Sequence, residues 1–141
     1  MPLVTLSLVL IVLANVLYHV SQKSIARTAP PVLSLLVTYG IALLGTFLLI
    51  PFFPVRGSLK EGWRQLNWAS AAVGVAALGI ELGFLIAYRA GLKVSLGSAV
   101  AGAAVAALLV PTGLLFFGER LSATNVVGVV LCAVGLFLAL R

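Results

Sequence analysis

Five long apolar stretches take up most of this 141-residue sequence and limit what it can fold into. They cover residues 3–20, 32–53, 68–88, 94–117 and 125–140, and polar or helix-breaking residues separate them. A helix needs about 20 residues to cross a hydrocarbon core of about 30 Å, and all five stretches reach or approach that length. We therefore expect an all-α integral membrane protein with five transmembrane helices in a single domain, residues 1–141.

The composition excludes a soluble domain. Only 9% of the residues are charged and 62% are hydrophobic, whereas a soluble domain needs about 25% charged residues to solvate its surface. The chain has nine Lys and Arg against three Asp and Glu, and these basic residues fall between the apolar stretches. Such residues are typical of loop anchors near lipid headgroups, so we expect the lipid bilayer as a partner and no nucleic acid. The expected location is the inner (plasma) membrane, with several crossings.

The first apolar stretch does not match a cleaved signal peptide. Met1, Pro2 and Leu3 carry no positive side chain, and the stretch is longer than a usual signal-peptide core. No small-residue cleavage site follows it. We expect this stretch to be retained as a helix.

The longest connection, residues 55–67, has a helical pattern of its own. Ser58 and Glu61 match a capping box, and Leu59, Trp63 and Leu66 share one helical face. We expect a short amphipathic helix over about 58–66 that lies on the membrane surface. Its role is either a connector, which the pattern favours, or a gate.

The distribution of Lys and Arg among the loops hardly favours either orientation of the chain in the membrane. Four basic residues fall on the N-terminal side of a five-span chain and five fall on the other side: Arg56, Lys60, Arg64 and Arg120, against Lys23, Arg27, Arg89, Lys93 and Arg141. Orientation normally follows an excess of Lys and Arg on the cytoplasmic side. We therefore expect dual topology, with two oppositely oriented copies pairing as an antiparallel homodimer. The alternative is that the segment from Lys23 to Arg27 fixes one orientation.

The C-terminal half, residues 87–140, resembles the second part of an EamA-type unit of the drug/metabolite transporter superfamily. The resemblance rests on a run of small residues with Pro111, on the turn that begins Gly118, Glu119, and on a last helix with Gly128 and Gly135. One such unit has five helices, and full-length members resemble two units in inverted orientation. The resemblance therefore implies an inverted homodimer that transports a small organic metabolite or a cationic or amphiphilic compound by alternating access, with or without proton coupling.

Glu81 is the strongest candidate for a binding residue. It lies about 13 residues into the third apolar stretch, or roughly 20 Å from its start at 1.5 Å per residue. A carboxyl group at that depth is costly unless it is paired, hydrated or protonated, so it normally faces the interior of the bundle. Such a group can exchange a proton for a cationic substrate. The alternative is a protonated or hydrogen-bonded residue that only packs helices together.

The first apolar stretch carries a polar stripe. Asn15, Tyr18, His19 and Gln22 fall within an arc of about 100° at 100° per residue. In hydrocarbon such a face must turn toward protein or a hydrated cavity. We expect Asn15, Tyr18 and His19 to line a substrate path, although His19 also lies near enough to the helix end to meet headgroups.

Further candidates have two interpretations each. Tyr88 either binds the substrate or the carboxyl group of Glu81, or anchors its helix at the interface. Tyr39, with Ser34 and Thr38, offers hydroxyl groups to a substrate, but Ser and Thr in membrane helices often bond to their own backbone. Pro111 removes a backbone hydrogen bond and acts either as a hinge or as a static kink.

Other classes of function find little support in the sequence. No nucleophile–base pair, paired carboxylates or phosphate-binding loop occurs, so we expect no enzyme and no cofactor. His19 has no second ligand at suitable spacing, so we expect no metal site, and Cys132 is expected to be a small packing residue. The main alternative to a transporter is a non-catalytic membrane subunit, such as half of a heteromeric flippase.

Overall fold

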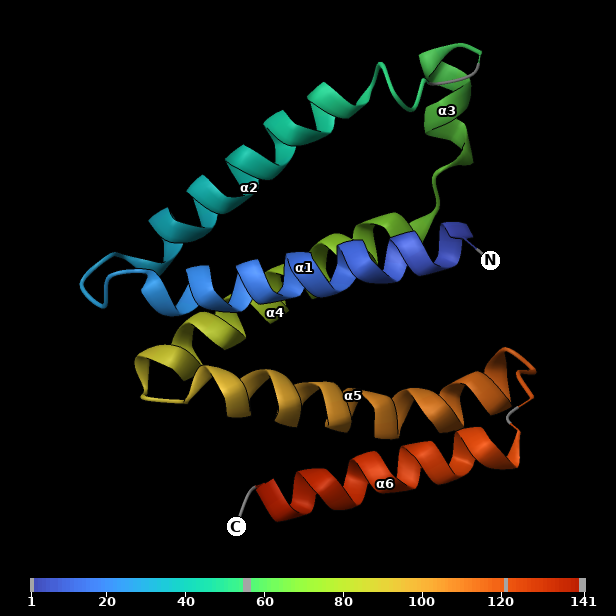
Figure 1. Cartoon of the computed structure of the whole chain (residues 1–141). Helices are drawn as coiled ribbons and strands as arrows, with labels where there is room; N and C mark the ends of the chain where they lie inside the picture. Colours follow the sequence, from blue (N-terminus) through green and yellow to red (C-terminus); the bar gives the residue numbers. More distant parts are fainter. Residues whose placement is uncertain (1, 55–56, 121, 140–141) are drawn as a thin grey trace. The chain divides into compact units, whose positions relative to one another are not determined.

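A computed structural model describes residues 2–54, 57–120 and 122–139 (Figure 1). These residues form six α-helices: α1 (Pro2–Ser24), α2 (Pro31–Leu49), α3 (Leu59–Gln65), α4 (Trp68–Arg89), α5 (Val94–Phe116) and α6 (Ala123–Ala139). Helices α1, α2, α4 and α5 are long and apolar enough to cross a membrane. The described residues are all-α, and four helices of membrane-spanning length agree with the prediction of a multi-pass membrane protein. Helix α6 is apolar but has 17 residues, so the fifth crossing stays a prediction.

Two helix ends differ by four residues from those expected. Helix α1 continues to Ser24 instead of ending at residue 20, because nothing before Pro30 prevents helical backbone. Helix α2 ends at Leu49 instead of residue 53, because Pro51 and Pro54 lack the amide hydrogens that a continued helix needs. The extension of α1 makes Gln22 part of a helix.

The short helix α3 begins with the predicted capping box. The Ser58 hydroxyl accepts from the Glu61 amide (3.2 Å), and the Glu61 carboxylate accepts from the Ser58 amide (3.1 Å). Gly57 precedes this cap with φ of +85°, a conformation that side chains with a Cβ rarely adopt. Trp63 of α3 and Trp68 at the start of α4 are largely exposed, as residues at a membrane interface would be. That α3 lies on the membrane surface stays a prediction.

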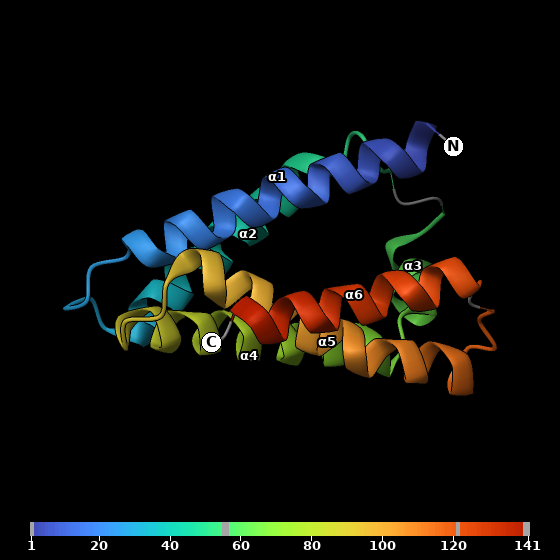
Figure 2. The same cartoon turned by 60° about the horizontal axis from the view of Figure 1, so that its bottom comes forward.

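Contacts between residues divide the chain into two compact units. One unit joins Met1–Val20 to Ala90–Arg141, and the other is Ser21–Arg89. In the first unit α5 and α6 pack side by side, and they lie next to each other in both views (Figures 1 and 2). In the second unit α2 packs against α4.

The turn between α5 and α6 ends one helix and starts the next. Gly118 has φ of +62°, and the Glu119 amide donates to the Gly113 carbonyl (3.1 Å). The Ser122 hydroxyl then accepts from the Asn125 amide (3.2 Å) and caps α6. Gly118 and Glu119 thus end α5, and Ser122 begins α6.

Several predictions concern residues outside the described part of the chain. These are the loop charges Arg56 and Arg141, Leu121 in the turn that begins Gly118, Glu119, and the end of the last apolar stretch at Leu140.

Candidate binding site around Glu81

Glu81 of α4 is held by a side chain from the end of α1. The Gln22 amide nitrogen donates a hydrogen bond to the Glu81 carboxylate oxygen Oε2. Gln22 is 6% exposed, and Glu81 is partly buried, so the contact is shielded from the surroundings. Both residues belong to the unit Ser21–Arg89. The partner of Glu81 is thus a neutral amide, an arrangement that both the binding role and the helix-packing alternative allow. The binding role of Glu81 stays a prediction.

One face of α4 carries Glu81 together with two buried side chains. Glu81, Leu85 and Tyr88 are spaced i, i+4 and i+7, so they share a helical face, which we call the α4 contact face. Leu85 and Tyr88 are 1% and 2% exposed, the lowest exposed fractions among the described hydrophobic side chains. Phe84 stacks on Tyr88 with ring centroids 5.6 Å apart. This packing limits the orientations of the helix face that presents Glu81.

Lys23, next to Gln22 in sequence, contacts the C-terminal end of the α4 contact face. Its ammonium group donates to the Tyr88 carbonyl (3.2 Å) and lies 5.7 Å from the centre of the Tyr88 ring. A cation near the last carbonyls of a helix complements the negative end of the helix dipole. Gln22 and Lys23 thus tie the end of α1 to α4 at two points seven residues apart. This arrangement assigns Tyr88 a structural contact with Lys23, and its proposed contact with a substrate stays untested.

Arg89 extends this connection into the loop after α1. Its guanidinium group donates to the Ala26 carbonyl (3.4 Å). The Arg89 Nε atom is buried and has no hydrogen-bond partner among the described residues. The loop that joins α1 to α2 is therefore attached to the end of α4 through a long side chain.

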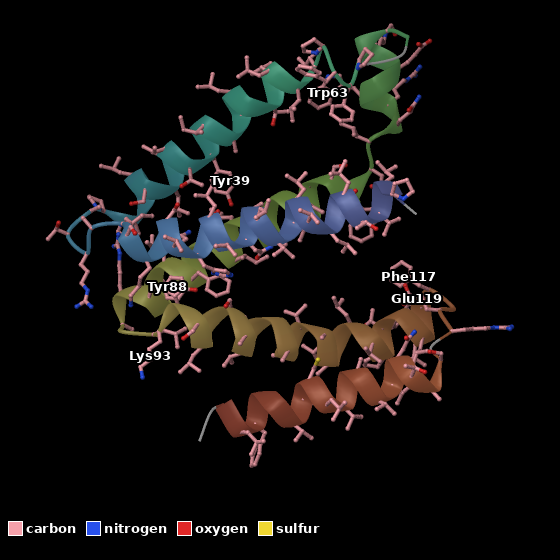
Figure 3. All side chains as sticks on the ribbon, viewed as in Figure 1. Tyr39, Trp63, Tyr88, Lys93, Phe117 and Glu119 are labelled. Atoms are coloured by element: carbon pink, nitrogen blue, oxygen red, sulfur yellow. The ribbon has the colours of Figure 1, made fainter. Side chains whose placement is uncertain are left out.

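Tyr39 lies on α2, which packs against α4, the helix that carries Glu81. Its side chain projects from α2 on the side of α4 (Figure 3). The Tyr39 hydroxyl oxygen is buried and has no hydrogen-bond partner within the described chain. By contrast, the Ser34 hydroxyl donates to the Pro30 carbonyl (3.3 Å), as the backbone-bonding alternative expects. A buried hydroxyl group without a partner is costly, so this position suits a bound water or ligand.

A purely apolar pocket opens beside Tyr39. This α2/α4 pocket has a volume of about 330 Å³. Its walls are Val32, Leu35, Leu36, Tyr39, Leu78 and Leu82. Leu82 directly follows Glu81, so a hydrocarbon pocket and a carboxylate belong to the same part of α4.

Asn15 and His19 belong to the other unit, where they line a separate pocket. This α1/α5 pocket has a volume of about 340 Å³ and lies between α1 and the start of α5. Asn15 lines it while its amide nitrogen donates to the Ile11 carbonyl (3.1 Å). His19 is 8% exposed, and the Tyr18 ring packs edge-on against it at 4.9 Å. Asn15 and His19 therefore line a pocket, and the Tyr18 ring packs against His19 beside it. That these three residues line a substrate path stays a prediction.

Pro111 lies inside α5, which continues on both sides of it from Val94 to Phe116. Its missing amide hydrogen leaves the Ala107 carbonyl without its usual helical donor. The neighbouring Thr112 hydroxyl donates to the Leu108 carbonyl (2.8 Å). A hinge at Pro111 stays a prediction.

Sequence reasoning missed the partners of Glu81. Gln22 was recognised in the polar stripe but fell beyond the expected end of its helix, and Lys23 was treated as a loop charge. The available signal was the absence of a helix breaker between residues 20 and 29, which allows α1 to continue. Among the described residues, no group of three His, Cys, Asp or Glu side chains is placed to hold a metal ion.

No family model, curated protein or solved structure matches this chain in sequence or fold comparisons.

Proposed function

We propose that this protein is a small secondary transporter that carries an amphiphilic organic cation across the inner membrane by alternating access. The observation that supports this most directly is the group formed by Glu81, Gln22 and Tyr39. The carboxylate and the amide are in contact, and the buried hydroxyl group comes from α2, which packs against α4; all three helices are of membrane-spanning length. Ionisable side chains at such positions commonly mark substrate or ion pathways.

Each part of the group has a distinct role in the proposal. The Glu81 carboxyl group binds either a proton or the cationic group of the substrate, and the Gln22 amide orients it. When the cation binds, the carboxyl proton is released to solvent, so charge is balanced in the site. The Tyr39 hydroxyl oxygen, which lacks a partner in the described chain, directs its lone pairs at the cationic group of the substrate.

In this proposal the α2/α4 pocket binds the hydrocarbon part of the substrate, while Glu81 binds its cationic group. Its apolar walls suit a short hydrocarbon portion, because burial of apolar surface favours binding by about 25 cal/mol per Å². A carboxylate beside an apolar pocket therefore favours an amine with a hydrocarbon tail over a fully polar metabolite.

The assembly that we propose is an inverted homodimer of two five-span, EamA-like protomers. The nearly even distribution of Lys and Arg supports insertion in both orientations. On α4, a Cβ atom added at Gly79 or Gly83 would meet no described atom within 4 Å, so this small-residue face has room for a second helix. Two inverted copies would supply the inverted repeat that many transporters carry in one chain.

The decisive experiment measures proton release in a weakly buffered detergent solution. Decyltrimethylammonium is added to the purified protein, and released protons are followed with a pH indicator. We expect stoichiometric release from the wild type and none from Glu81→Gln. The matched control Glu61→Gln changes a carboxylate of α3 and keeps its capping function, so release should be unchanged.

Proteoliposome flux completes the test. Purified wild-type protein should drive pH-dependent uptake of the same cation, and Glu81→Gln should abolish uptake while the dimer remains assembled. Uptake that is unchanged in Glu81→Gln would refute the assignment of Glu81. No flux from wild-type protein, together with a single orientation in terminus-accessibility labelling, would instead indicate a non-catalytic subunit.

A further inference from the structure

We infer that the α1/α5 pocket is a second binding site, which takes a small uncharged molecule with a hydroxyl or amide group. It lies in the unit that joins Met1–Val20 to Ala90–Arg141 and contains none of the residues proposed above to bind a cation. The inference therefore goes beyond the proposed function and does not depend on it.

The pocket combines an apolar wall with a few polar groups on two helices. Ile11, Val16 and Val94 provide hydrocarbon surface, whereas Asn15 and Ser98 provide polar atoms. Its volume of about 340 Å³ is at the lower end of the range of about 300–1,000 Å³ for small-molecule sites. An apolar pocket with few placed polar groups is the usual form of such a site.

The polar groups have defined capacity for further hydrogen bonds. One hydrogen of the Asn15 amide nitrogen is used by the Ile11 carbonyl, and the Ser98 hydroxyl donates to the Val94 carbonyl (3.3 Å). The second Asn15 hydrogen can donate, and the Asn15 and Ser98 oxygens can accept. A hydroxyl or amide group matches this set because it both donates and accepts.

His19 adds a buried, oriented imidazole ring to the same pocket. Its exposed fraction is 8%, and the edge-on contact with Tyr18 at an interplanar angle of 75° restricts the ring. A restricted polar side chain loses little entropy when a ligand binds, which favours selective recognition. The remaining polar lining residue, Ser95, comes from the first turn of α5.

Charge distinguishes this pocket from the site around Glu81. None of the described residues that line it is Asp, Glu, Lys or Arg. A permanent charge placed there would lose its hydration without gaining a counter-ion, which is strongly unfavourable in an apolar setting. The α1/α5 pocket should therefore exclude the cations that Glu81 attracts.

A matched pair of probes tests this inference on the full-length protein in nanodiscs. 4-Fluorobenzyl alcohol and 4-fluorobenzylammonium share a ring and differ in one neutral or cationic group. Binding is measured by ¹⁹F NMR titration, with empty nanodiscs correcting for partition into lipid. The wild type should bind the alcohol, and an excess of unlabelled benzyl alcohol should displace it.

Two variants locate the site. Ser98→Leu fills the pocket and should weaken binding of the alcohol at least tenfold, whereas Thr112→Leu, on α5 and outside the pocket, should leave it unchanged. If Ser98→Leu does not fold, Asn15→Leu removes the amide at nearly constant volume and should weaken alcohol binding at least fivefold.

The outcomes separate this inference from the proposed function. Glu81→Gln should leave alcohol binding unchanged, even if it abolishes binding of the ammonium probe. Alcohol binding that survives Ser98→Leu and Asn15→Leu, or that is equally reduced by Thr112→Leu, would overturn the second site. Loss of ammonium binding in Ser98→Leu with intact alcohol binding would also overturn it.

Discussion

The contact between Gln22 and Glu81 is open to a direct thermodynamic test by a double-mutant cycle. The substitutions are Gln22→Leu, Glu81→Leu and the two combined. Gln22→Leu leaves a partly buried carboxyl group without its amide donor, and Glu81→Leu leaves a buried amide without its acceptor. Each single substitution should lower the free energy of unfolding by about 1–3 kcal/mol, the cost of an unsatisfied buried polar group.

The size of the coupling follows from the nature of the contact. A hydrogen bond to an ionised group contributes about 1.5–3 kcal/mol, and one between neutral groups about 0.5–1.5 kcal/mol. Polar pairs inside membrane bundles average about 0.6 kcal/mol, because the unfolded state in the membrane also finds partners. We therefore expect a coupling free energy of about 1–2 kcal/mol between Gln22 and Glu81.

The assay is reversible unfolding in mixed micelles by titration with sodium dodecyl sulfate, followed by circular dichroism. A control cycle combines Glu81→Leu with Thr46→Val, whose hydroxyl group donates to the Ala42 carbonyl of its own helix (2.8 Å). This control should be additive within about 0.5 kcal/mol. A Gln22–Glu81 coupling no larger than that of the control would refute the pairing on which the site is built.

Two further predictions concern local structure and assembly. Gly83→Ala adds a Cβ atom into open space within the protomer, so unfolding of the protomer should change by less than about 0.5 kcal/mol. The proposed dimer should nevertheless dissociate more readily, as measured by energy transfer between labelled protomers diluted in lipid, and an unchanged dimer would exclude this face from the interface. Ser58→Ala removes the hydroxyl group that accepts from the Glu61 amide, at a local cost of about 1 kcal/mol. Amide exchange in α3 should then be about fivefold faster, with no change in α4, and equal exchange in both proteins would show that the cap contributes nothing.

Features that depend on neighbours in sequence were predictable from the chain itself. Hydropathy and length identified the four membrane-length helices. In lipid the backbone amides and carbonyls of an apolar stretch find no water, so they must bond to each other, which a helix achieves within one segment. The capping box at Ser58 and Glu61 was predictable because its two hydrogen bonds span three residues. The position of Glu81 along α4 followed in the same way from the constant rise of a helix.

Only the tertiary structure decided which side chains meet Glu81. Gln22 is 59 residues away in sequence, and Lys23 is 65 residues from its contact at Tyr88. These contacts depend on where α1 ends and on how each helix is rotated about its own axis. A helix that is apolar on all sides has no distinct face in its sequence, so the sequence gives little information about that rotation. Periodicity placed Asn15, His19 and Gln22 on one face of α1, but it could not assign the first two to the α1/α5 pocket and the third to Glu81. The sequence alone therefore determined the class of protein and its candidate polar residues, whereas long-range packing determined how those residues are grouped into sites.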